Sequence, residues 1–429
     1  MVVYTPILHP RLDYTMRWMF SFAGEELRVT SDVIVFTNAS GPRVWYSNEP
    51  CPVSDAASFL QVEVMWNDAI SNLQPAVCYK NNMPFPDLDG SGRFDPFAST
   101  FFLLSRYEEY STVSFDEHGR FSGKQAWGGP AVVFRPWADI WRSEVHSLIR
   151  RHYPSYHPSV PGFRTVATID VDSAFAFRYK GVRRTLGGVA KDFLRLKPGR
   201  AFTRLKCVLG NEQDPFDTYD YIIDTCLAQH IELRCFFLLA DRSRYDINVD
   251  HRNTQLRERM EDMRDGAAIV GIHPGYESHN DIRIVRSEIA RLDAILGEKT
   301  VHSRQHFLKF RLPVTFRRLL ECDIRHDHSM GYADVPGFRA GTAHSFKWFD
   351  VERNEITSLI VHPIIVMDST LRHYQQLDLL EAMEIIARLK SEVRNTGGDF
   401  VSLWHNETVA EQGDWVGWRA VWEEAIKPG

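Results

Sequence analysis

The sequence lacks features that would assign the protein to several specialised classes. Its six cysteines are scattered without a Cys-x-x-Cys pair, which argues against a disulfide framework. No apolar run approaches the length of a membrane-spanning helix, and the first residues lack the pattern of a secretory signal. The formal net charge of −6 argues against a dedicated nucleic-acid-binding protein. We therefore expect a cytoplasmic globular protein whose thiols stay reduced.

The first part of the chain has the mixed pattern of a small α/β domain. Four short segments are expected to be strands: residues 15–20, 26–29, 33–36 and 43–46. Apolar spacing predicts helices over residues 95–110 and 137–152. The proline-containing segment 153–158 is predicted to link this domain, residues 1–160, to the rest of the chain.

From residue 164 onward, apolar runs of strand length alternate with amphipathic helices. This alternation predicts a parallel sheet covered by helices. The number of strand–helix units, about six or seven, predicts a closed or nearly closed β/α barrel over residues 161–429.

The run Thr168-Ile169-Asp170-Val171-Asp172 places two carboxylates at the end of a predicted buried strand. Side chains alternate along a strand, so Asp170 and Asp172 point the same way. Two like charges this close require a cation, or a raised pKa at one of them. A metal ligand beside a general base meets this requirement; the alternative is a pair of solvated acids.

Other strand ends carry residues that suit the same chemistry. His273, Arg304, His306 and His405 each follow an apolar run. In a β/α barrel the carboxyl ends of the strands meet at one rim, so these side chains are expected to converge there. Carboxylate and imidazole ligands without thiolate suit zinc, or another divalent metal such as cobalt, nickel or iron.

Residues 164–408 resemble the polysaccharide deacetylases of carbohydrate esterase family 4. The resemblance rests on the motifs Thr168 to Asp172, His273-Pro274-Gly275-Tyr276-Glu277-Ser278-His279, Arg304-Gln305-His306-Phe307 and Ser402-Leu403-Trp404-His405. A closer resemblance, to a divergent bacterial subgroup with an extra N-terminal α/β domain, rests on residues 101–110, 337–342 and 366–368. The family implies a (β/α)7-type barrel and a metal-dependent hydrolase that removes N-acetyl groups from amino sugars.

The resemblance also implies roles for individual residues. Asp170 would be the catalytic base, oriented by Arg304, and His405 the general acid. Asp172 and His273 would bind the metal. The third ligand stays open, because the family's second motif is His-x-x-x-His, whereas His279 lies six residues after His273. His306, where the family usually has proline, is the other candidate.

Further residues are candidates for substrate contacts. Arg339 would hold a hydroxyl, carboxylate or phosphate group of the substrate, or else form a structural ion pair. Trp404 would stack on a sugar ring, or else belong to the core. Asp327, Asp368 and Asn406 are expected either to contact the side chains of the site or to contact a sugar. The predicted substrate is an N-acetylated amino sugar in a polysaccharide, glycolipid or precursor. The altered second motif leaves a non-catalytic protein that binds carbohydrate or a partner as the alternative.

An insertion over residues 179–207 differs from the rest in charge. It contains nine lysines and arginines against one acid, Asp192, with apolar residues interleaved. Such a segment suits an anionic membrane surface or another polyanion, and would place the protein peripherally at the inner membrane surface. The alternative is a solvated basic face.

Overall fold

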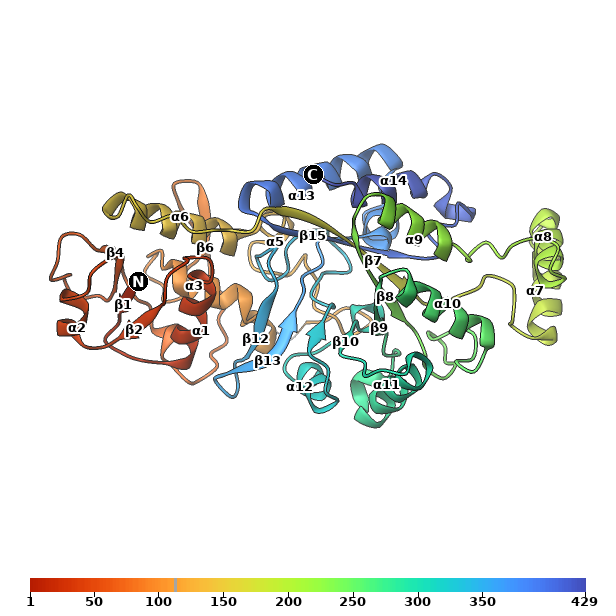
Figure 1. The fold of residues 1–429 in the computed structure, drawn as a ribbon, viewed down its shortest axis with the longest axis horizontal. Coiled ribbons are helices and arrows are strands. Elements are labelled where there is room, and N and C mark those ends of the chain that lie inside the picture. The colour runs from red at the N-terminus through yellow and green to blue at the C-terminus, as the bar shows by residue number, and fades with distance from the viewer. Residues whose placement is uncertain (112–113) are drawn as a thin grey trace.

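The computed structural model describes residues 1–111 and 114–429 (Figure 1). The N-terminal part contains a parallel sheet in the order β2-β1-β3-β4, formed by β1 (Val2–Tyr4), β2 (Arg28–Thr30), β3 (Arg43–Tyr46) and β4 (Ala57–Phe59). A hairpin of β5 (Val77–Lys80) and β6 (Met83–Pro86) follows it in the chain. The helices of this part are α1 (Pro10–Met19), α2 (Val33–Thr37), α3 (Pro96–Leu104), α4 (Glu108–Ser111), α5 (Gly129–Val133) and α6 (Trp137–His152).

Two of the four predicted N-terminal strands are helices, so these two predictions were wrong. Residues 15–20 fall mostly within α1, which starts with Pro10 and is buried around most of its circumference. An apolar run of this kind looks the same in a buried strand and a buried helix. Residues 33–36 lie in α2, because the Asp32 carboxylate accepts hydrogen bonds from the first backbone N–H groups. This N-cap outweighs the strand preference of the β-branched residues.

The larger sheet has nine strands in the order β12-β13-β11-β10-β9-β8-β7-β15-β14. All neighbouring strands run parallel except β12, which is antiparallel to β13. The strand β7 is almost continuously buried, as expected for a strand covered on both faces. The strands are β7 (Phe163–Val171), β8 (Glu232–Phe237), β9 (Ile269–Ile272), β10 (His302–Ser303), β11 (His326–Asp327), β12 (Phe346–Asp350), β13 (Glu355–Val361), β14 (Val366–Met367) and β15 (Gly398–His405).

Helices follow most strands of this sheet, as the alternating pattern predicted. They are α7 (Val182–Leu194), α8 (Pro198–Val208), α9 (Tyr219–Ala228), α10 (Thr254–Asp265), α11 (Ile282–Leu296), α12 (Val314–Glu321), α13 (Leu379–Thr396) and α14 (Trp418–Ile426). Within the described residues, no helix is both long and apolar enough to cross a lipid bilayer. The chain is therefore a mixed α/β protein with two parallel or mostly parallel sheets.

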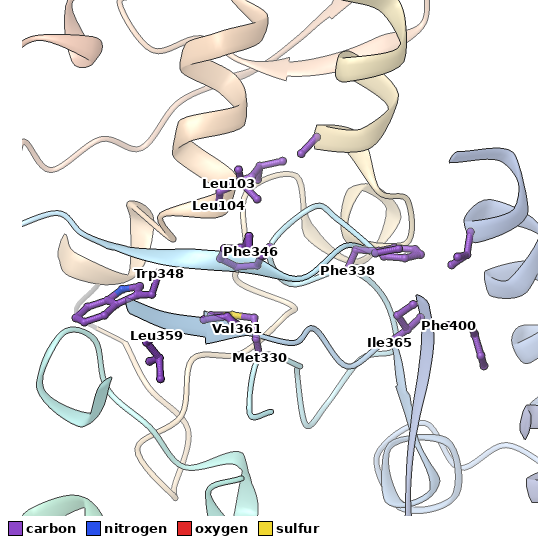
Figure 2. Packing of buried hydrophobic residues seen from close by; sticks show 14 of the residues in the cluster. Leu103, Leu104, Met330, Phe338, Phe346, Trp348, Leu359, Val361, Ile365 and Phe400 are labelled. Atoms are coloured by element: carbon purple, nitrogen blue, oxygen red, sulfur yellow. The ribbon is translucent and has the colours of Figure 1, made fainter. Parts of the chain in front are cut away.

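A continuous apolar core joins the N-terminal helices to the larger sheet. Leu103 and Leu104 at the end of α3 lie over Phe346 of β12, as Figure 2 shows. Val361 of β13 and Phe338 belong to the same buried cluster. The N-terminal part is therefore packed against the larger sheet through apolar side chains.

Buried charges cross the same boundary. Arg339 donates to both oxygens of the Glu109 carboxylate, at 3.0 and 2.6 Å. Arg106 donates to Glu109 at 2.7 Å and to the backbone oxygen of Arg339. Each of the three side chains is at most 5% exposed. Removing one member of such a network leaves the others charged in a medium that solvates them poorly.

Replacing Glu109 with alanine should therefore lower the free energy of unfolding by about 3–5 kcal/mol. Urea denaturation followed by circular dichroism measures this change. The matched control is Glu352→Ala, which removes a carboxylate 2.9 Å from Arg317 at an exposed position. That loss should stay within about 1 kcal/mol. Equal losses in the two variants would contradict a structural role for the buried network.

Candidate metal centre and active site

The strand ends of the larger sheet bring most of the predicted site residues together. Asp170 and Asp172 stand at the end of β7, and His405 ends the neighbouring strand β15. The register pairs His405 directly with Asp170. His273 follows β9, and His306 lies three residues after β10. Because these strands are parallel, their carboxyl ends meet at one edge of the sheet.

Asp172, His273 and His306 form a compact group of three potential metal ligands. One ligand atom from each lies within 4.8 Å of the other two. The Nε2 atoms of His273 and His306 lie 3.2 and 3.3 Å from the two Asp172 carboxylate oxygens. Asp172 Oδ1 and His273 Nε2 are buried and make no hydrogen bond. Such orphaned polar atoms are costly unless a ligand satisfies them, so this group fits a divalent cation.

His279, the other candidate for third ligand, does not join this group. The Nδ1 atom of His279 contacts the backbone oxygen of Tyr276 at 2.9 Å. The backbone oxygen of His279 accepts a hydrogen bond from Arg318. The Pro274-Gly275 step turns the chain before a short helix over Ser278–Asn280. The structure thus brings His306, rather than His279, to the carboxylate of Asp172.

A second set of contacts fixes the two histidine rings. His273 donates from Nδ1 to the backbone oxygen of Arg304 at 2.6 Å. His306 donates from Nδ1 to Asp246 Oδ1 at 2.9 Å. These contacts leave both Nε2 atoms directed toward Asp172. Asp246 had not been predicted, because it lies in the loop after β8 and no motif marks it.

Replacing Asp246 with asparagine should weaken zinc binding by about 10- to 100-fold, because the partner that orients His306 and raises its basicity is lost. Competition against a chromophoric chelator measures the affinity. The matched control, Asp241→Asn, changes an 85% exposed residue in the same loop and should leave the affinity unchanged. Equal affinities for wild type and Asp246→Asn would contradict this role of Asp246.

Two charge pairs flank the group of ligands. Arg304 is fully buried and donates to Asp170 Oδ1 at 2.8 Å. On the other side, His405 donates from Nδ1 to the Asp368 carboxylate at 3.0 Å. Its Nε2 atom lies 3.7 Å from Asp172 Oδ2. Asp368, predicted to support the site or to contact a sugar, therefore orients His405.

Burial and neighbouring charges act in opposite directions on the ionisable groups. Burial alone would raise the pKa of Asp172, but His306 and His273 hold that pKa well below its usual range. Burial would lower the pKa of His306, yet Asp172 and Asp246 raise it to about 9. Burial likewise opposes charge on His405, but Asp368 raises its pKa well above the usual value. The carboxylates thus attract positive charge to the centre of the group.

The group opens into a pocket of about 290 Å³. Its polar wall includes Asp170, Asp172, His273, His306 and His405, and its other residues are Arg120, Phe307, Leu308, Met367, Ser369, His373, Tyr374 and Leu403. Arg120 comes from the N-terminal part, where it donates to the backbone oxygen of Phe307 and to the Tyr374 hydroxyl at 3.0 and 2.8 Å. The first 160 residues therefore contribute to the pocket, which had not been predicted.

None of the five predicted substrate residues is among the described residues that line this pocket. Asp368 binds His405 from behind the pocket wall, and the other four have different surroundings. Arg339 lies in the buried network with Glu109. Trp404 is fully buried in the core, because it points to the opposite face of β15 from Leu403 and His405. Asp327 accepts hydrogen bonds from Ser329, and burial raises its pKa to about 7. The Asn406 amide donates to backbone oxygens of neighbouring loops.

Known proteins resemble parts of the chain. Residues 1–154 match a family of unknown function (DUF7033). No curated protein matches the sequence. A candidate polysaccharide deacetylase from Mycobacterium smegmatis matches with 13% identity and a TM-score of 0.41, over 63% of this chain and 84% of its own. A CE4 family pseudoenzyme from Bacillus anthracis matches with 10% identity and a TM-score of 0.30, over 63% of this chain and 64% of its own. IcaB from Ammonifex degensii matches with 15% identity and a TM-score of 0.23, over 39% of this chain and 83% of its own.

The chain thus resembles polysaccharide deacetylases among the solved structures, as its motifs predicted. One of these matches is a pseudoenzyme, and a mutant of it with restored activity matches as well. At 10–15% identity, what this chain does has to be inferred from its own residues.

Proposed function

We propose that the protein is a metal-dependent hydrolase that removes an N-acetyl group from an amino sugar of a polysaccharide, glycolipid or glycan precursor in the cytoplasm. The observation that carries this proposal is the convergence of three ligand atoms within 4.8 Å, flanked by a carboxylate on one side and a carboxylate-bound histidine on the other. Hydrolysis of an amide requires a polarised carbonyl, a base for the attacking water and an acid for the departing amine.

Asp172, His273 and His306 would hold the cation, with zinc favoured over cobalt, nickel or iron by the ligand types. When bound, the cation polarises the carbonyl group and lowers the pKa of water. The partnerless Asp172 Oδ1 and His273 Nε2 atoms support this assignment.

The other side chains would move protons and shape the site. Asp170 would accept a proton from the attacking water, because Arg304 holds its carboxylate in place. His405 would donate a proton from Nε2 to the leaving amine, because Asp368 binds the opposite side of the ring. Leu308, Met367 and Leu403 make an apolar wall that would exclude water and accept an acyl methyl group.

The proposed fold is the (β/α)7-type barrel that the resemblance implies, over residues 161–429, with residues 1–160 as an accessory α/β domain. Backbone hydrogen bonds support closure of the sheet into a barrel. Ile364 donates to Met330, just beyond β11, at 2.9 Å, and Ile365 donates to Val401 of β15 at 3.0 Å. The segment before β14 therefore bridges the end of β11 and β15.

Metal analysis and acetate release test this function. Protein purified without chelator should contain about one divalent metal ion per chain and release acetate from N-acetylglucosamine oligomers or lipid-linked amino sugars. Chelation should remove the activity, and added zinc should restore it. Less than about 0.1 metal ion per chain after zinc addition, without acetate release, would instead favour a non-catalytic carbohydrate- or partner-binding protein.

A further inference from the structure

The basic insertion forms a helical arm that extends from the larger sheet (Figure 1). Its two helices, α7 and α8, pack against each other. The Phe193 and Phe202 rings meet edge to face, and Arg204 donates to Asp192 at 2.9 Å. At the base of the arm, Asp214 accepts three backbone hydrogen bonds from residues 176–178 at 2.6–2.9 Å. The arm is therefore a folded hairpin with a fixed attachment.

Large apolar side chains on this arm face solvent. Leu196, in the turn between the helices, is 89% exposed, and Leu194 is 85% exposed. Val182 and Leu186 share the face of α7 that leads to Leu194, because the three recur at multiples of four residues. Contiguous exposed apolar residues of this kind mark an interaction surface.

Cations surround these apolar residues. The single acid, Asp192, is already bound by Arg204, and Arg200 lies 3.7 Å away. No ion pair involves the exposed side chains of Arg183, Lys191, Arg195 or Lys197 in the described part of the chain, residues 1–111 and 114–429. The arm therefore presents free positive charge next to free apolar surface.

We propose that the α7–α8 arm docks the protein on the surface of an anionic lipid bilayer. The exposed leucines enter the boundary between head groups and acyl chains, and the lysines and arginines contact the anionic head groups. A second copy of the chain is a poorer partner, because it would bring the same cations against each other. A polyanion without an apolar phase would leave the leucines in water. The proposal is independent of the catalytic role of the pocket.

The arm also fixes the orientation of the docked protein. The arm follows β7 in the chain. Lys180, at its base, donates to the hydroxyl of Ser173, the residue after Asp172, at 3.2 Å. Docking through the arm therefore holds the pocket at a constant distance from the bilayer, with the N-terminal sheet at the far end of the molecule (Figure 1).

Co-sedimentation of the full chain with lipid vesicles tests the docking. Binding to vesicles of phosphatidylcholine with roughly 30 mol% phosphatidylglycerol should be at least about ten-fold stronger than to phosphatidylcholine alone. It should weaken markedly at about 0.5 M salt. Equal binding to both vesicles, or no binding to either, would overturn the proposal. A concentration-dependent dimer without vesicle binding would assign the arm to a second copy instead.

Two sets of substitutions locate the surface. Binding should fall at least about ten-fold in the variant with Arg183→Gln, Lys191→Gln and Arg195→Gln, and also in the variant with Leu186→Ser, Leu194→Ser and Leu196→Ser. A control with three exposed cations changed elsewhere, Arg257→Gln, Lys299→Gln and Arg353→Gln, should bind as wild type does. Equal loss in the control would overturn the assignment to the arm. If circular dichroism shows that the leucine variant is misfolded, comparison of the charge variant with its control still tests whether the arm binds the vesicles.

Discussion

Replacing His306 with alanine is expected to lower the affinity for zinc by about 100-fold or more, because one of the three ligand atoms is lost. The two remaining ligands, Asp172 and His273, cannot enclose the ion at tetrahedral positions without a third protein group. Calorimetric titration of metal-free protein with zinc measures the affinity. The same variant should lose acetate release in proportion to its bound metal.

His279→Ala is the matched control for this prediction. It also removes an imidazole, but one whose ring contacts a backbone oxygen rather than Asp172. Zinc affinity should therefore stay at the wild-type value. If His279→Ala lost zinc and His306→Ala kept it, the ligand would be the histidine of the second motif, and the segment after Pro274 would have to rearrange. If neither variant changed the affinity, the proposed centre would be wrong.

The sequence predicted much of the neighbourhood of the site because parallel strands impose a shared edge. Each strand end could be recognised by its apolar run, and His273, His306 and His405 then followed from their positions along the chain. The same rule does not predict the positions of residues in loops. Asp246 lies in the loop after β8, and its contact with His306 depends on how that loop folds back. The apolar periodicity of the chain does not predict how this loop places Asp246 beside His306.

Long-range pairing explains the other differences between sequence and structure. Arg339 was a candidate for substrate binding or for an ion pair, and its carboxylate partner, Glu109, lies 230 residues earlier. A single sequence does not reveal such a partner. Arg120 similarly reaches the pocket from the N-terminal part. The predicted boundary near residue 160 thus separates two patterns of secondary structure. The pocket, however, is lined by residues from before and after this boundary.

Short segments near the N-terminus were harder to predict than the long helices. The prediction for residues 137–152 matches the bounds of α6, whose apolar residues recur over several turns. Residues 33–36 offered only four positions, too few to establish a period. There the decisive interaction is local: the Asp32 side chain caps the first turn of α2.

Asp170→Asn should reduce the turnover number for deacetylation by about 100- to 10,000-fold, because the amide cannot accept the proton of the attacking water. The substitution keeps the size of the side chain and retains an oxygen for the hydrogen bond from Arg304. It also leaves Asp172, His273 and His306 in place. Zinc affinity and the free energy of unfolding should therefore change much less than turnover. Steady-state acetate release, together with a zinc titration of the same preparation, separates these quantities.

The control for Asp170→Asn is the same chemical change at the opposite end of the sheet. Asp399 stands near the start of β15 and pairs with Arg164 at 2.7 and 2.8 Å, far from the carboxyl ends of the strands. Asp399→Asn should leave turnover at the wild-type value, so a loss confined to Asp170→Asn reports on the reaction. If Asp170→Asn kept full activity with zinc bound, another group would have to take the proton. Among the described residues that line the pocket, the only carboxylates are Asp170 and the metal ligand Asp172. Full activity in this variant would therefore contradict the proposed hydrolytic mechanism itself, and not only the assignment of its base.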